Sequence, residues 1–173
     1  PSVMVYQCAK WQPVSTFKTA LWDVTKVVTA FTLAHSITLS MAALGVVALP
    51  SRWVESAIAA SVIMAALNNL VPILTGKRTH LAFAFGLIHG FGFASVLADL
   101  GLTESSRLWG LLGFNLGVEI GQLALVIVFL PIAYKLSRYP LYKPVILKSC
   151  SIGIAGLACI WLMERAFDIA IMV

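Results

Sequence analysis

The chain has 173 residues, of which 60% are apolar and only 11% are charged, and its mean hydropathy is +0.95. So apolar a composition argues against a water-soluble domain of this length. A transmembrane β-barrel is also disfavoured, because its sequence would show short strands of alternating polarity. The net charge of +5 does not call for a nucleic-acid partner, because basic loops at one membrane face explain it. We therefore expect an all-α protein, a polytopic transmembrane helical bundle whose partner is the lipid bilayer.

The first 23 residues differ from the rest of the chain. Residues 1–23 mix polar, basic and aromatic side chains, and Pro13 disfavours a continuous helix there. Trp11 and Trp22 suit the level of the lipid headgroups. We expect residues 1–23 to be an interfacial segment and residues 24–173 to form the transmembrane domain.

Five apolar runs follow this segment. A spanning helix needs about 20 mostly apolar residues. The predicted spans are residues 24–49, 54–74, 81–100, 108–134 and 145–163. The first run ends before Pro50, and Pro131 is expected to kink the fourth run near its end.

The basic residues predict an orientation. One side of this five-span arrangement collects nine of them: Lys10, Lys18, Lys26, Lys77, Arg78, Lys135, Arg138, Lys143 and Lys148. The other side has three: Arg52, Arg107 and Arg165. Because cytoplasmic loops are enriched in Lys and Arg, we expect the N-terminal side of the chain to be cytoplasmic.

The fourth run carries a polar stripe at membrane depth. Glu119 is the only acidic residue deep within an apolar run, and Asn115 and Gln122 lie four residues before it and three residues after it. At this spacing the three side chains share one helix face. That face presents a carboxylate and two amides to a polar neighbour.

Two other runs supply polar groups at the same depth. The first run holds Thr32 and Ser36 within a Ser/Thr stripe at helical spacing, with His35 beside it, and the third run holds His89. Ionisable side chains inside a membrane usually face the bundle interior, a cavity or each other, so we expect His35, His89 and Glu119 to converge. Two imidazoles, a carboxylate and amide oxygens suit a borderline divalent metal such as Ni²⁺, Co²⁺ or Zn²⁺.

Four other interpretations stay open. Ser and Thr in spanning helices often bond only to their own backbone. An intramembrane His is often a structural hydrogen-bonding partner between helices, and a His–Glu pair needs no metal. An intramembrane enzyme ranks last, because Ser36 and Ser95 lack a recognisable nucleophile–base motif.

Glycines at four-residue spacing mark two further helix faces. The third run has Gly86 and Gly90, and the fourth has Gly113, Gly117 and Gly121. Small residues at this spacing let helix backbones approach closely. We therefore expect the fourth helix to be central, with its glycine face packed on one neighbour and its polar face toward another.

Four sequence words resemble the HupE/UreJ family of membrane proteins. They are residues 29–39 (TAFTLAHSITL), 54–55 (VE), 86–94 (GLIHGFGFA) and 114–122 (FNLGVEIGQ). They fall in each of the first four predicted helices, whereas the fifth is matched only loosely.

The resemblance implies a secondary transporter, not an enzyme, that moves nickel or cobalt across the bacterial inner membrane. The implied metal ligands are His35, His89 and Glu119, and Asn115, Gln122, Ser36 and Thr32 orient them or line the pathway. No firmly held cofactor is expected besides the bound or transported ion. The resemblance also implies a sixth helix with a His- and Asp-containing motif, which either precedes Pro1 or is missing. The alternative is a non-transporting subunit of a larger membrane complex.

Overall fold

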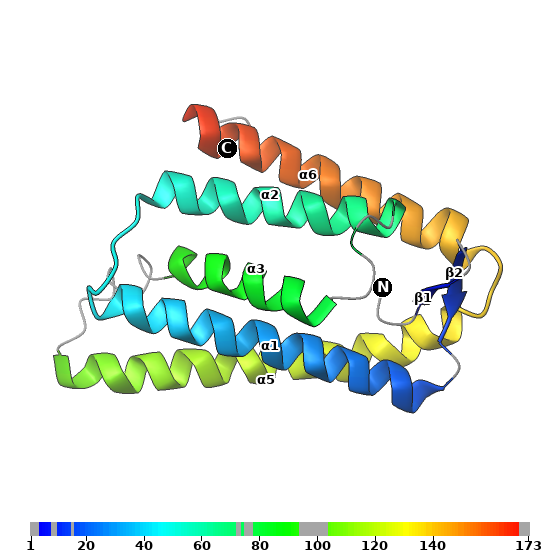
Figure 1. Cartoon of the computed structure of the whole chain (residues 1–173), viewed down its shortest axis with the longest axis horizontal. Helices are drawn as coiled ribbons and strands as arrows, with labels where there is room; N and C mark the ends of the chain where they lie inside the picture. The colour runs from blue at the N-terminus through cyan, green and yellow to red at the C-terminus, as the bar shows by residue number, and fades with distance from the viewer. Residues whose placement is uncertain are drawn as a thin grey trace.

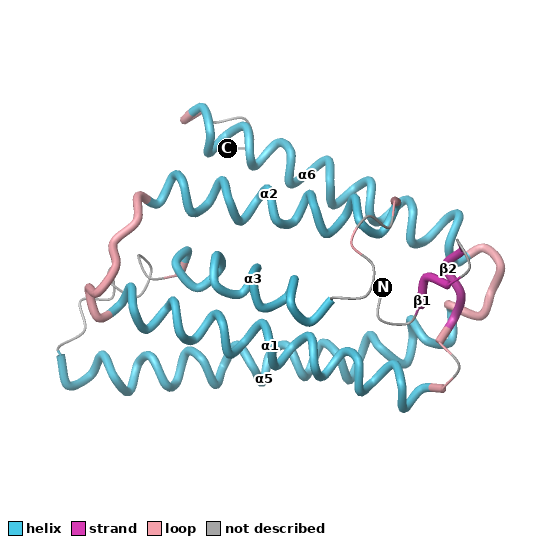
Figure 2. Tube along the Cα trace, in the orientation of Figure 1, coloured by secondary structure: helices cyan, strands magenta, loops and turns pink. Residues whose placement is uncertain are grey.

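The computed structural model describes residues 4–7, 10–14, 16–71, 74, 78–93 and 104–169. The helices are α1 (Phe17–Ala43), α2 (Ser51–Leu70), α3 (Arg78–Gly92), α5 (Glu104–Leu136), the π-helical turn η1 (Tyr142–Leu147) and α6 (Lys148–Phe167). The strands β1 (Met4–Gln7) and β2 (Lys10–Pro13) form a small antiparallel hairpin. Apart from this hairpin and the connecting loops, the described chain is helical, which confirms the predicted class (Figure 2).

Consecutive helices run in opposite directions and form two layers (Figure 1). Helices α1, α3 and α5 form one layer, and α2 packs along α6 in the other. Helix α3 contacts both α1 and α2 and so joins the layers. Helix α5 contacts α1 and lies at the edge of its layer.

Four of the described helical stretches are long and apolar enough to cross a bilayer. They are Phe17–Ala43, Ser51–Leu70, Trp109–Leu136 and Tyr142–Phe167. The described part of α3 has 15 residues, fewer than the roughly 20 that a span needs. The predicted third helix continues into residues 94–100, which lie outside the described residues. A multi-pass membrane protein is confirmed, and the fifth span stays a prediction.

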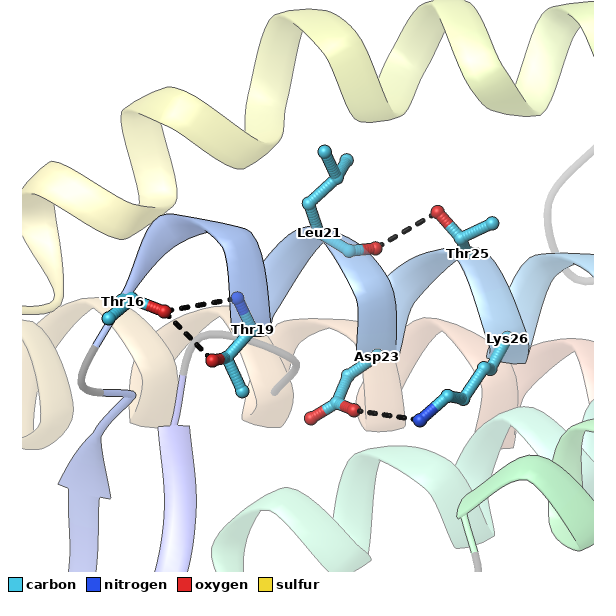
Figure 3. A network of polar contacts seen from close by, with 6 residues as sticks. All are labelled: Thr16, Thr19, Leu21, Asp23, Thr25 and Lys26. Carbon is cyan, nitrogen blue, oxygen red and sulfur yellow. Dashed lines mark hydrogen bonds and ion pairs between the residues drawn. The ribbon is translucent and has the colours of Figure 1, made fainter.

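Both predicted ends of the first helix were wrong. Helix α1 begins at Phe17, within the expected interfacial segment, because the Thr16 hydroxyl caps it by accepting from the backbone N–H of Thr19 at 3.2 Å (Figure 3). It ends at Ala43 rather than before Pro50. Gly45 has φ 73°, and the N–H of Val46 donates back to the Met41 carbonyl at 2.9 Å, which is a glycine-terminated helix end.

The two ends of the bundle differ in charge. The antiparallel order brings the hairpin, the starts of α1, α3 and α6 and the ends of α2 and α5 to one end (Figure 1). That end therefore holds the described members of the nine-residue basic set, as the sequence predicts. Near it, Asp23 pairs with Lys26 at 3.8 Å. The side of the membrane that this end faces stays a prediction.

At the other end of the bundle, charged side chains connect the start of α2 to the end of α6. The Nε atom of Arg165 lies 2.8 Å from Oε2 of Glu55. The Arg52 guanidinium donates to the carbonyls of Arg165 and Ala166 at the end of α6. Glu55, which belongs to one of the four sequence words, therefore has a structural partner here.

The glycine face of α5 overturns one prediction. An added Cβ at Gly113, Gly117 or Gly121 would meet no atom within 4 Å. Helix α5 turns the buried Leu111 and Leu130 toward α1, so its glycines point away from the bundle. The expectation that the fourth helix is central and buried on its glycine face is wrong for the described chain.

Candidate functional site

His35 lies at the centre of the layer formed by α1, α3 and α5. Its side chain is 2% exposed. The ring stacks on Phe31 at a centroid distance of 6.0 Å and on Phe114 at 6.4 Å, and the Phe93 ring meets it edge-on at 5.7 Å. Three aromatic rings, from α1, from α5 and from the turn directly after α3, thus surround a buried imidazole.

One ring nitrogen of His35 lacks a partner. Its Nδ1 atom is buried and has no hydrogen bond within the described part of the chain. The Asn115 amide lies near the ring, and it donates one of its two Nδ2 protons to the Leu111 carbonyl at 3.0 Å. A buried polar atom without a partner lowers the stability of the fold by about 1–3 kcal/mol. We therefore expect this nitrogen to bind a water molecule or an ion, or to have a functional role.

A polar seam joins α1 to α5 beside His35. The Ser36 hydroxyl donates to Oδ1 of Asn115 at 2.9 Å. About one helical turn away, the Thr32 hydroxyl donates to Oε1 of Gln122 at 3.1 Å. Because α1 and α5 are antiparallel, the later residue of α1, Ser36, pairs with the earlier residue of α5, Asn115. The structure thus brings together all four residues that the sequence placed along the pathway.

The Ser and Thr residues of α1 that form described hydrogen bonds within the membrane-spanning part are of two kinds. Thr32 and Ser36 bond across to α5. Thr25 donates to the Leu21 carbonyl at 2.9 Å (Figure 3), and Thr38 donates to the Ala34 carbonyl at 3.2 Å, so both bond to their own helix. The purely local interpretation holds for these two residues and fails for the two that face α5.

His89 connects the two layers. Its Nε2 atom lies 2.8 Å from the Ser61 hydroxyl of α2, and that hydroxyl also lies 2.7 Å from the Ile58 carbonyl. A serine hydroxyl has one proton, so both bonds are made when Ser61 donates to the carbonyl and accepts from Nε2–H. This assignment leaves Nδ1 of His89 as the ring atom with a free lone pair.

Phe31 lies between the two histidines. The His89 ring meets Phe31 edge-on at a centroid distance of 5.3 Å, and His35 stacks on the same ring. Sequence reasoning missed both Phe31 and Ser61 as members of this cluster. The only signal for Ser61 was a hydroxyl within an apolar run.

Glu119 is not joined to the histidines. Its side chain is half-buried on α5, between Asn115 and Gln122, and it forms no hydrogen bond or ion pair with another described residue. Across the described ranges, no three His, Cys, Asp or Glu side chains gather closely enough to hold a metal ion. The structure thus makes neighbours of His35 and His89 but does not assemble the expected three-ligand group, and the metal-binding role of all three stays a prediction.

The Ser61–His89 pair has the distance of a catalytic dyad but not its surroundings. Ser61 is 3% exposed and lies inside a helix, where backbone N–H groups already donate to helical carbonyls. Such a hydroxyl has no free donors nearby to stabilise an oxyanion. Ser36 bonds to an amide rather than to a base, and Ser95 lies outside the described residues. Within the described ranges, the cluster therefore offers lone pairs and hydroxyls at membrane depth and no group of donors suited to acyl transfer.

The comparisons with known proteins address the whole chain. The sequence model of the HupE / UreJ protein family matches residues 3–165. No significant match was found among the curated proteins or among the solved structures. The family match runs from the N-terminal hairpin nearly to the end of α6 and includes every member of the polar cluster. The chain belongs to the HupE/UreJ family.

Proposed function

We propose that this protein is a permease that carries a divalent nickel or cobalt ion across the inner membrane through the interface of α1, α3 and α5. The observation that carries the proposal is the unpartnered Nδ1 atom of the buried His35. A neutral imidazole nitrogen is a good ligand for these metals, and membership of a transport-type family agrees with an ion pathway. The proposal needs no catalytic group.

The seam residues supply the weaker contacts on this route. The Thr32 and Ser36 hydroxyls and the amides of Asn115 and Gln122 can replace part of the hydration shell of the ion. Their modest affinity suits transport, because an ion must leave its site as well as enter it. The Nδ1 lone pair of His89 offers a second nitrogen on the other side of Phe31.

Glu119 supplies negative charge in this scheme. A divalent cation at membrane depth is costly unless a nearby anion offsets its charge. Glu119 is the only carboxylate deep in an apolar run, and its half-buried place on α5 leaves it free of described partners. A movement of this side chain toward the seam would bring the charge to the ion.

Uptake of radioactive nickel into proteoliposomes tests the proposal. His35→Ala and Glu119→Gln should each abolish uptake. His80→Ala should leave it unchanged, because His80 is exposed near the start of α3 and touches none of the cluster. Unchanged uptake in correctly folded His35→Ala protein would overturn the proposal.

A second function is favoured by the open glycine face of α5. Gly113, Gly117 and Gly121 leave a helix surface that no described residue covers. Under this alternative, α5 docks on a helix of another membrane protein and the chain is a non-transporting subunit. A complex isolated in mild detergent at twice the monomer mass or more, together with no nickel uptake, would favour this alternative over the permease.

A further inference from the structure

A cavity of about 260 Å³ lies at the basic end of the bundle. Asn69 and Leu70 from the end of α2 line one side, and Lys143, Pro144 and Leu147 from η1 line the other together with Lys148 from the start of α6. It is separate from His35 and from the hydrogen bonds between α1 and α5, which lie in the other layer. Nothing in the permease proposal uses it.

The cavity has the charge of an anion site. Its lining includes two lysines and no acidic residue. Neither Lys143 nor Lys148 forms an ion pair with a described residue, and the acidic group described near this end, Asp23, pairs with Lys26 instead. Asn69 uses one amide N–H on Ser151, at 3.4 Å, and keeps a second donor.

The position of the cavity favours a lipid over a soluble anion. One candidate span ends at Leu70 and another begins at Tyr142, so the cavity lies where the apolar surface of both helices stops. About one turn farther along the same helices, Leu67 is 45% exposed and Ile152 is 57% exposed. Basic pockets between spanning helices at this level hold anionic headgroups, and exposed apolar side chains accommodate acyl chains.

We propose that this cavity binds the phosphate of an anionic phospholipid headgroup. The two ammonium groups contact the phosphate oxygens, the Asn69 amide donates to the headgroup, and Leu70, Pro144 and Leu147 form the apolar rim. The lipid bridges α2 to α6 at the end opposite the Glu55–Arg165 ion pair. The site thus gives the layer of α2 and α6 a lipid-dependent contact.

Native mass spectrometry of the full chain, titrated with phosphatidylglycerol, tests this site. The Lys143→Gln, Lys148→Gln double variant should lose affinity by about tenfold or more, because each lysine near a membrane surface contributes measurably to anionic lipid binding. The matched control is the Lys18→Gln, Lys135→Gln double variant, which removes the same charge from the same end and does not line the cavity. It should bind as the wild type does, and phosphatidylcholine should not distinguish the proteins.

Three outcomes would overturn the proposal. Equal losses in the cavity variant and the control would mean diffuse attraction to the basic end. Displacement of phosphatidylglycerol by millimolar inorganic phosphate, with the same dependence on Lys143 and Lys148, would mean a soluble-anion site. No loss in the cavity variant would mean that no lipid is held there. If the double variant does not fold, the single change Lys143→Gln, at an exposed position, replaces it with the same expected direction.

Discussion

The glycine faces of α3 and α5 have the same four-residue spacing and different surroundings. A Cβ added at Gly86 would lie 2.9 Å from the Ala34 Cβ and would also meet the Phe31 carbonyl of α1. A Cβ at Gly117 would meet nothing within 4 Å. The spacing permits close helix approach, but a partner must be present, and α5 already uses its opposite side to bind α1.

This difference also separates two kinds of helix contact. Helix α3 approaches α1 backbone to backbone, which brings the Phe93 ring against the ring of His35. Helix α5 meets α1 through side chains, with apolar contacts at Leu111 and Leu130 and polar bonds between them. One neighbour of His35 is therefore held by close packing and the other by hydrogen bonds.

The largest expected effect is at the packed glycine face. In Gly90→Leu, the new side chain would collide with the Thr38 hydroxyl and the His35 carbonyl, so α1 and α3 must separate. We expect a loss of about 3 kcal/mol in the free energy of unfolding, at the upper end of overpacking costs. Thermal unfolding in detergent measures it. If the variant does not express, Gly90→Ala tests the same contact with a single added carbon, and a melting temperature equal to that of the wild type would contradict the close approach.

The matched change on the open face should have little effect. Gly117→Leu places the same side chain where nothing lies within 4 Å. We expect the free energy of unfolding of the monomer to change by no more than about 0.5 kcal/mol. A loss as large as that of Gly90→Leu would contradict the open face.

A small effect is also expected at the hydrogen-bonded seam. Thr32→Val removes the donor to Gln122, and an interhelical hydrogen bond in a membrane protein contributes about 0.6 kcal/mol. Thr25→Val makes the same chemical change where the hydroxyl bonds only to its own helix, so its cost should be near zero. Equal melting temperatures for the two variants would mean that the seam does not hold α5 to α1.

The sequence predicts those features of the fold that depend on the residues of a single helix. Apolar length predicts the spanning helices, and the basic residues predict which helix ends lie together. The end of α1 was not predicted, because residues 46–49 continue the apolar run past Gly45, whose left-handed conformation ends the helix. Thr16 is of a residue type favoured at helix caps, but Lys18 and Asp23 interrupt the apolar pattern, so the first turns of α1 were not predicted.

The sequence predicts the candidate site only in part, because a site on several helices depends on their packing. Periodicity on one helix identifies Asn115 and Gln122 as one face, and both bond to α1. It cannot say that Ser61 faces His89, or that Phe31 separates the two histidines. It also cannot say which of two faces of α5 meets a neighbour, since glycines and polar residues both suit helix contacts.

Nickel binding by purified protein is the most direct test of the central claim, which is that the unpartnered nitrogen of His35 receives a metal ion. We expect the nickel X-ray absorption spectrum of the wild type to show imidazole nitrogen in the coordination shell, and the affinity to fall as the pH is lowered, because protons compete for that nitrogen. His35→Ala should weaken binding by at least about tenfold, since even residues that only orient a ligand contribute that much. His80→Ala should match the wild type. Unchanged affinity and an unchanged spectrum in His35→Ala would contradict the account.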